Sequence, residues 1–349
     1  MAKEIFSASR RSFIKKSAVI TTGLTLPFSM YNGFVDKDLI LGHGDFRYKV
    51  DINWGVLDSK KFPVKDCHEM VYTKSGNIIM LTNDIRNNII KYNKDGKLLS
   101  TWGNEYPGGH GLTLKDEGGE EFLYLTDTER HEVVKTTMDG KVVMKIAAPK
   151  DLQVFINPAN FQPTETAISE TGDIYIADGY GSQLILVYGQ DGQLKNYFGG
   201  VGEDENKFFN AHGIAIDTRR GNEKILVTAR QKNQLKYFTP EGKYESTIDL
   251  GGAFICRPVI KDDNVYLATI WSGNGAADTG FVSILDKDNE LVSAPGGNRP
   301  IYQDDSLSHM HQTVQVFRHP HDVCIDEDDN VYVCQWNAGQ TYPIKMTRV

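Results

Sequence analysis

The chain has 349 residues, of which 40% are hydrophobic, and a formal net charge of −8. The negative charge and the lack of a long Lys/Arg run exclude a nucleic-acid scaffold, because phosphate binding requires a basic surface. The four cysteines, Cys67, Cys256, Cys324 and Cys334, are too scattered for a zinc knuckle or a disulfide framework. The fold must therefore rest on an apolar core.

The N-terminal segment is typical of an export signal. The sequence SRRSFIKK at 9–16 is followed by a weakly apolar stretch at 17–28. This pattern resembles a twin-arginine signal, and its apolar part is too short and too polar for a transmembrane helix. We expect a signal segment at 1–30, either cleaved or kept as an anchor. We expect residues 31–349 to form one monomeric domain that works in the periplasm or as a secreted protein.

A unit of short strands recurs six times along the chain. Its opening strands are apolar and lie at 68–72, 110–114, 164–168, 212–216, 256–260 and 321–325. A second strand follows a polar turn, and a third runs into a hairpin turn with glycine, as at Gly96 and Gly140, where a positive φ is needed. The openings are about 40–65 residues apart, close to the period of a four-stranded propeller blade. The sequence predicts an all-β, six-bladed β-propeller.

The last unit ends one strand short. The segment YKVDINWG at 48–55 resembles the fourth strands of the other units but has no blade before it. We therefore predict that this N-terminal strand completes the last blade and closes the ring, which removes two unpaired strand edges.

Three of the opening strands begin with histidine. His110, His212 and His321 open the second, fourth and sixth units. The first strand of a blade is innermost, and alternate blades of a six-fold ring are about 120° apart, so these imidazoles should converge on the axis. Three neutral imidazoles with an open fourth position are typical of a catalytic zinc site. The alternative is that each histidine only caps its strand.

The odd units begin differently, with His68, Thr164 and Cys256. Histidine opens all three even units, whereas the odd units open with a mixed set of residues. Histidines that only capped their strands would show no such preference, so the pattern favours the metal site. His68 remains open between a fourth ligand, a substrate contact and a polar lining residue of the channel.

Two further residues suggest chemistry beside the histidines. Tyr180 and Arg230 follow the second strands of units three and four, so they should lie on neighbouring blades. A tyrosine beside a guanidinium and a divalent metal can give up its proton and act as a base. The alternatives are packing of Tyr180 between blades and a surface ion pair for Arg230.

Several motifs resemble the peptidyl-α-hydroxyglycine α-amidating lyases, within the NHL-repeat six-bladed propellers. They include GHGLTL at 109–114, QPTETAISETGDIYIADGYGSQLI at 162–185, FNAHGIAI at 209–216 and HPHDVCIDEDDNVYV at 319–333. The similarity spans roughly residues 62–349. It implies a zinc-dependent lyase that cleaves the N–C bond of a carbinolamide and releases an amide and a glyoxylate-like aldehyde.

The resemblance also implies roles for single residues. His110, His212 and His321 would hold zinc, Tyr180 would abstract the hydroxyl proton of the substrate, and Arg230 would lie near it.

A structural calcium is implied as well. Its ligands would be Asp322 and the backbone carbonyls of Met70 and Leu112, and a shell of oxygen atoms suits calcium.

The chain departs from the family pattern in two places. Asn83 stands where the family has a second arginine, with Arg86 three residues further on, and Gly181 stands where the family has a cysteine. We expect Asn83, Arg86 and His68 to contact the substrate.

Two alternatives remain. One is an extracellular propeller that binds or cleaves a carbohydrate, with an oligosaccharide held by Arg230 and Arg86. The other is a non-catalytic NHL-repeat interaction module with a structural metal, which would be closed by four protein ligands. The expected partner is otherwise a small molecule or a peptide.

Overall fold

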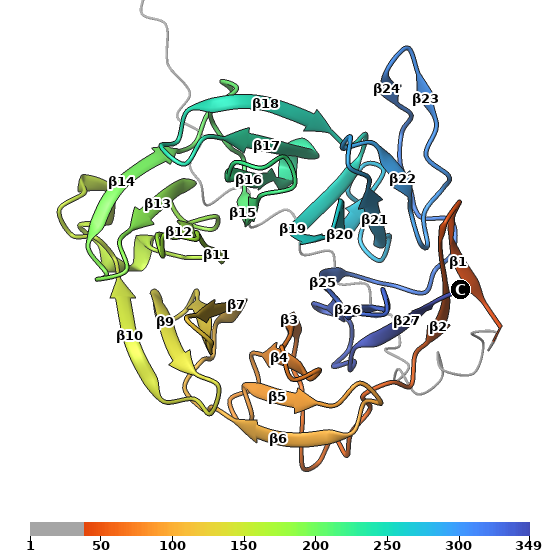
Figure 1. The fold of residues 1–349 in the computed structure, drawn as a ribbon, viewed down its shortest axis with the longest axis horizontal. Helices are drawn as coiled ribbons and strands as arrows, with labels where there is room; N and C mark the ends of the chain where they lie inside the picture. The colour runs from red at the N-terminus through yellow and green to blue at the C-terminus, as the bar shows by residue number, and fades with distance from the viewer. Residues whose placement is uncertain (1–37) are drawn as a thin grey trace, which may run out of the picture. The chain divides into compact units, whose positions relative to one another are not determined.

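The computed structural model describes residues 38–349, and these form six β-sheets arranged in a ring (Figure 1). The first blade contains β3 (Cys67–Tyr72), β4 (Ile78–Thr82), β5 (Ile89–Tyr92) and β6 (Leu98–Trp102). The second contains β7 (Gly109–Glu117), β8 (Glu120–Asp127), β9 (Glu132–Thr137) and β10 (Val142–Ala147). The third contains β11 (Glu165–Ile168), β12 (Ile174–Ala177), β13 (Leu184–Tyr188) and β14 (Leu194–Gly199). The fourth contains β15 (Ala211–Asp217), β16 (Lys224–Ala229), β17 (Gln234–Phe238) and β18 (Tyr244–Asp249). The fifth contains β19 (Ala253–Lys261), β20 (Asn264–Ser272), β21 (Phe281–Leu285) and β22 (Leu291–Ser293). The predicted six-bladed propeller is confirmed.

The sixth blade joins the two ends of the described chain. Its strands run in the order β25 (Pro320–Ile325), β26 (Val331–Gln335), β27 (Ile344–Arg348), β2 (Phe46–Asp51) and β1 (Ile40–His43). Strand β2 pairs antiparallel with β27, which confirms that an N-terminal strand closes the ring. Strand β1 adds a fifth strand that the sequence analysis did not predict.

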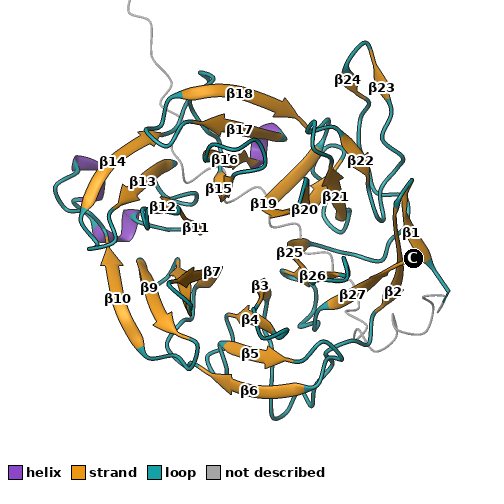
Figure 2. Ribbon diagram, viewed as in Figure 1, coloured by secondary structure: helices purple, strands orange, loops and turns teal. Residues whose placement is uncertain are grey.

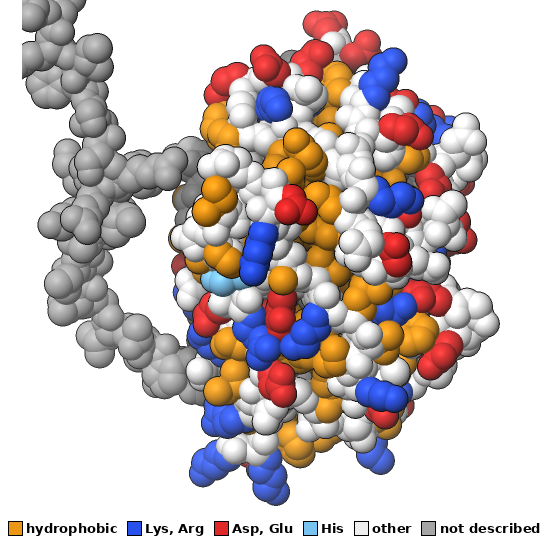
Figure 3. Space-filling view, turned by 90° about the vertical axis from the view of Figure 1, so that its left-hand side faces the viewer, with side chains coloured by type: hydrophobic (Ala, Val, Ile, Leu, Met, Phe, Trp, Pro, Cys, Tyr) orange, Lys and Arg blue, Asp and Glu red, His pale blue; other side chains and the backbone are white. Residues whose placement is uncertain are grey.

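The core lies between the blades. Six clusters of buried apolar side chains occur in the described part of the chain, and each is shared by two neighbouring blades. The second strand of a blade is packed on both faces, so β4 and β12 are continuous apolar runs. The outer strand β14 is partly exposed along its length. Figure 3 shows that this outer rim mixes acidic, basic and apolar side chains.

Loops and turns join the strands, and helix is scarce in the described residues (Figure 2). Besides the blade strands, the described part of the chain forms a short hairpin and three turns of 3₁₀-helix: β23 (Tyr302–Gln303) with β24 (Ser306–Leu307), η2 (Gln153–Phe155), η3 (Pro158–Asn160) and η4 (Arg230–Lys232). Within 38–349 no helix is long and apolar enough to cross a membrane. The predicted signal segment lies outside the described residues.

Candidate metal centre and its surroundings

The structure brings the three predicted zinc ligands together at the centre of the ring. His110, His212 and His321 come from the inner strands β7, β15 and β25, and all three are buried. The ring centroids are 4.9 Å apart for His110 and His212, 4.7 Å for His110 and His321, and 4.9 Å for His212 and His321. The three rings therefore lie close together at nearly equal separations.

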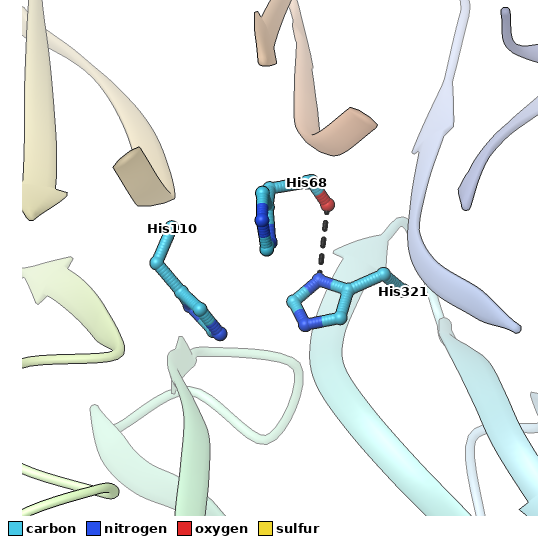
Figure 4. A group of neighbouring side chains, drawn as sticks. All are labelled: His68, His110 and His321. Carbon is cyan, nitrogen blue, oxygen red and sulfur yellow. Dashed lines mark hydrogen bonds between the residues drawn. The ribbon is translucent and has the colours of Figure 1, made fainter. Parts of the chain in front are cut away.

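His68 belongs to the same cluster. Its ring centroid lies 4.9 Å from that of His110 and 4.8 Å from that of His321, and the three rings point toward one another (Figure 4). Candidate ligand atoms of His68, His110 and His321 all lie within 4.8 Å of one another, and the same holds for His212, Cys256 and His321. The centre thus offers four imidazoles and one thiol.

Backbone carbonyls fix the orientation of two of these rings. Nδ1 of His110 lies 2.9 Å from the carbonyl oxygen of Thr164, and Nδ1 of His321 lies 3.1 Å from that of His68. A carbonyl only accepts, so each Nδ1 carries the proton and each Nε2 keeps a free lone pair. Figure 4 shows the second of these bonds as a dashed line.

The protonation and the unmet polar atoms of the cluster suit a metal ion. Burial lowers the pKa of all four histidines, for His68 to about 3, so the imidazoles are neutral, as metal ligands must be. Nδ1 of His68 and Nδ1 of His212 are buried and have no hydrogen-bond partner among the described residues. A buried polar atom without a partner destabilises the fold unless a bound group interacts with it. The donor set therefore fits a metal such as zinc.

Tyr180 reaches into the cluster from the third blade. Its hydroxyl lies 3.1 Å from Nε2 of His110 and 3.2 Å from Nε2 of His212. Nη2 of Arg230 donates to the same hydroxyl at 3.4 Å. Tyr180 is 40% exposed as a residue, whereas His110, His212 and Arg230, which surround its hydroxyl, are buried.

The turn after β12 is built to hold Tyr180 in this place. The carboxylate of Asp178 accepts from the backbone N–H of Gln162 at 2.6 Å and from that of Ser182 at 2.5 Å. A Cβ on Gly179 would lie 2.2 Å from a backbone oxygen, and so would a Cβ on Gly181. Glycine on both sides of Tyr180 therefore lets the turn pack directly against neighbouring backbone.

Arg230 is a buried cation without a carboxylate partner in the described part of the chain. It begins η4 directly after β16, and its side chain is 5% exposed. The guanidinium carbon lies 5.7 Å from the ring centroid of Tyr180 and 5.5 Å from that of Trp271. The positive charge is thus held beside the Tyr180 hydroxyl by two aromatic rings.

A charged layer lies one residue further along the inner strands. Glu69, Glu165, Arg257 and Asp322 each follow the residue that opens a blade, and all four are buried. Burial raises the pKa of Glu69 well above its usual value, and the neighbouring carboxyl of Glu165 adds to this effect.

Arg257 occupies the place predicted for calcium. Its guanidinium donates to both carboxylate oxygens of Asp322, at 3.0 and 2.8 Å, and to the carbonyl oxygens of Leu112 at 2.7 Å and Met70 at 3.0 Å. The three predicted ligands are therefore brought together, but around a side-chain cation. The residues present do not fit a calcium ion at this point, and the sequence analysis missed Arg257.

The predicted substrate contacts Asn83 and Arg86 form hydrogen bonds with nearby loop residues. Asn83 accepts from the backbone N–H of Asp66 at 2.9 Å, and Arg86 donates from Nη2 to the carboxylate of Asp84 at 2.6 Å. The structure brings neither into hydrogen-bond contact with the histidines, and their role toward a substrate stays a prediction.

Comparison with known proteins gives relatives by sequence. No family model matches the chain. It is 26% identical to human NHL repeat-containing protein 3 over 185 residues. This alignment covers 45% of this chain and 53% of that protein. It is 31% identical to peptidyl-alpha-hydroxyglycine alpha-amidating lyase 1 of Drosophila melanogaster over 136 residues. This alignment covers 35% of this chain and 24% of that protein. The chain thus covers about half or less of these relatives.

Solved structures share the fold at low identity. A streptogramin B lyase structure has a TM-score of 0.58 at 13% identity, covering 90% of this chain and 99% of that one. A gluconolactonase from Xanthomonas campestris has a TM-score of 0.60 at 9% identity, covering 90% and 96%. The chain is therefore a six-bladed β-propeller whose relatives by sequence include NHL repeat proteins and peptidyl-α-hydroxyglycine α-amidating lyases.

Proposed function

We propose that this chain is a metal-dependent lyase that cleaves the N–C bond of a carbinolamide. The observation that carries this proposal is the position of the Tyr180 hydroxyl, 3.1 and 3.2 Å from Nε2 of two neutral histidines and 3.4 Å from a buried guanidinium. A candidate base, a cation and a metal donor set thus meet at one point. The similarity to amidating lyases over part of the chain supports this choice of reaction.

His110, His212 and His321 would hold the metal, with His68 beside them. A zinc ion in such a site acts as a Lewis acid that polarises an oxygen of the substrate. Because burial keeps the imidazoles neutral, no histidine has to lose a proton before it binds the metal.

The residues of the chain account for the movement of the proton. Tyr180 acts in its phenolate form, whose negative charge the guanidinium of Arg230 stabilises, and the phenolate oxygen takes the proton of the substrate hydroxyl. As the C–O⁻ group becomes a carbonyl, the C–N bond breaks and its electron pair goes to nitrogen. The departing nitrogen takes up a proton, which Tyr180 is placed to return. The products are an amide and an aldehyde.

A second function, a non-catalytic module with a structural metal, is favoured by the place of His68. Its ring is as close to His110 and His321 as those rings are to each other. A fourth protein ligand would close the metal site, and closed sites are structural.

The test is the variant Tyr180→Phe, assayed on an N-acyl-α-hydroxyglycine and analysed for metal by elemental mass spectrometry. Loss of a positioned acid–base group should lower kcat by about 10²–10⁴-fold, with the metal content unchanged. Tyr197→Phe, at an exposed site on the outer strand β14, is the control and should leave kcat unchanged.

Two outcomes would redirect the proposal. Unchanged turnover in Tyr180→Phe would remove its role as base. Loss of the metal in His68→Ala, together with no turnover of carbinolamides by the wild-type protein, would favour the structural module.

We also propose that the protein works outside the cytoplasm as a monomer. The twin-arginine pattern at 9–16 supports export.

A further inference from the structure

The charged layer beneath the histidines is an oxygen cage around one side chain. Arg257 enters the cage from β19 of the fifth blade. Besides its four hydrogen bonds to Asp322, Leu112 and Met70, it lies 3.3 Å from a carboxylate oxygen of Glu69 and 3.7 Å from one of Glu165. The cation thus contacts the inner strands of the first, second, third and sixth blades.

The cage is tied together by its acids as well. Asp322 of the sixth blade accepts from the backbone N–H of Met70 in the first blade at 2.8 Å. Glu69 of the first blade accepts from the backbone N–H of Leu112 in the second blade at 2.6 Å. Asp322 and Glu69 therefore connect neighbouring blades in addition to contacting Arg257.

The fourth blade makes room for this arrangement. A Cβ on Gly213 would lie 2.5 Å from the Cα of Arg257 and 2.7 Å from the carbonyl oxygen of Cys256. Glycine at this position lets β15 approach β19 closely enough for Arg257 to reach the axis.

The donor set of this cage is that of a hard cation. Three carboxyl groups and two backbone carbonyls supply only oxygen atoms, which is the ligand type that calcium takes in proteins. We propose that the guanidinium of Arg257 is a built-in cation that replaces a divalent ion in the channel. It braces the inner strands without calcium, and its removal uncovers a calcium site. This inference does not depend on the metal at the histidines or on the proposed reaction.

The first experiment uses the wild-type protein with zinc held constant. Its melting temperature should change by less than about 1 °C between excess EGTA and 5 mM CaCl₂, with no calcium binding in isothermal titration, because a ligand stabilises only a state that it binds. Calcium binding by the wild-type protein, or a melting temperature that rises with calcium, would overturn the proposal.

The second experiment uses Arg257→Ala and Arg257→Met, both prepared with and without CaCl₂. Removing one partner of a buried ion-pair network should lower the melting temperature in EGTA by at least about 5 °C. Calcium should then bind with a Kd below about 1 mM and restore most of that loss, whereas magnesium, which demands a stricter geometry, should restore less. The methionine variant fills the volume of the side-chain stem, so it is the variant of choice if the alanine variant does not fold.

Arg318→Ala is the matched control. It removes a guanidinium from the carboxylate of Asp278, an Arg–Asp pair that is partly exposed and has no second carboxylate in its ion pair. This variant should show no response to calcium. Folded Arg257 variants that bind no calcium, or failure of both to fold in CaCl₂, would overturn the proposal that the cage accepts a divalent ion. Zinc content, measured in parallel, separates this result from the fate of the proposed lyase site.

Discussion

At the scale of residues, the centre of the ring depends on which side chain stands at the start of each inner strand. His68, His110, His212 and His321 occupy this position, and the next residue in each strand faces the charged layer or is glycine. A Cβ on Gly111 would lie 2.7 Å from the carbonyl oxygen of Thr164, so the residue after His110 has to be small. The pair His–Gly therefore combines a polar group on the axis with close contact to the next blade.

The four histidines make the metal-free protein sensitive to acid. Burial lowers their pKa values in the folded state, whereas the unfolded chain binds protons with a pKa of about 6.5. Below that pH the unfolded state binds more protons, so stability falls as the pH falls. Each histidine should change the unfolding equilibrium constant by up to about tenfold per pH unit. Urea denaturation of the metal-free protein between pH 7.5 and 5 measures this.

The variant His131→Gln is the control for that measurement, because His131 lies outside the cluster. It should follow the wild-type curve, whereas replacing His110 and His212 by glutamine should make the curve shallower. A wild-type stability that is flat between pH 7 and 5 would contradict the assignment of neutral imidazoles in the folded state.

The residues that could be predicted from the sequence are those whose place follows from the repeat. The position of His110, His212 and His321 at the strand openings placed them on the axis, and the matching turns placed Tyr180 beside Arg230. Arg257 was missed because it stands in the most degenerate opening, although it has the same register as Asp322. Asn83 is bonded to Asp66 in the loop before β3 and Arg86 to Asp84 in its own loop, and no repeat pattern describes these loop contacts.

At the scale of elements, the turn between β12 and β13 decides where Tyr180 points. Asp178 holds the turn through backbone N–H groups, and Gly179 and Gly181 let it pack against the backbone of adjacent segments. The strands that have counterparts in other blades could be predicted to within a few residues. Strand β1 and the β23–β24 hairpin have no counterparts, so the repeat could not reveal them.

The variant Gly179→Ala tests the role of this turn. The new Cβ would lie 2.2 Å from the carbonyl oxygen of Ala211, so the turn must shift and carry Tyr180 with it. Such overpacking should cost about 1–3 kcal/mol of unfolding free energy. A displaced base should lower kcat by about 10²-fold, measured on the substrate of the Tyr180→Phe test.

Gly202→Ala serves as the comparison. Its Cβ would lie 3.0 Å from Cγ and 3.2 Å from Cβ of Lys207 and would meet no backbone atom that closely, so stability should change less than in Gly179→Ala. If Gly179→Ala keeps both full stability and full turnover, the turn does not position Tyr180.

At the scale of the whole molecule, the ring is closed by hydrogen bonds between segments that are far apart in sequence. Val50 of β2 pairs with Met346 of β27, and Nη1 of Arg348 donates to the hydroxyl of Tyr48 at 2.9 Å. Tyr48 is fully buried in the cluster that joins the fifth and sixth blades. The inner strands of four blades bring histidines to the axis, so we expect closure of the ring to set the geometry of this cluster as well.

Truncation separates the contributions of the two N-terminal strands. A protein that begins at residue 38 is the reference, one that begins at 45 lacks β1, and one that begins at 53 lacks β2 as well. Loss of β1 uncovers the edge of a paired strand and should lower the melting temperature by only a few degrees. Loss of β2 uncovers β27 and removes the buried Tyr48, and a large aromatic side chain alone contributes about 3–5 kcal/mol.

We therefore expect the protein that begins at 53 to melt at least about 10 °C below the reference, or to aggregate through its open edge. Because the proposed metal ligands His110, His212 and His321 come from the second, fourth and sixth blades, the metal content should fall in parallel. Adding a peptide that spans residues 45–56 should restore part of both properties, since it supplies the missing strand. If the protein that begins at 53 melts within a few degrees of the reference and keeps its metal, closure by β2 does not stabilise the ring.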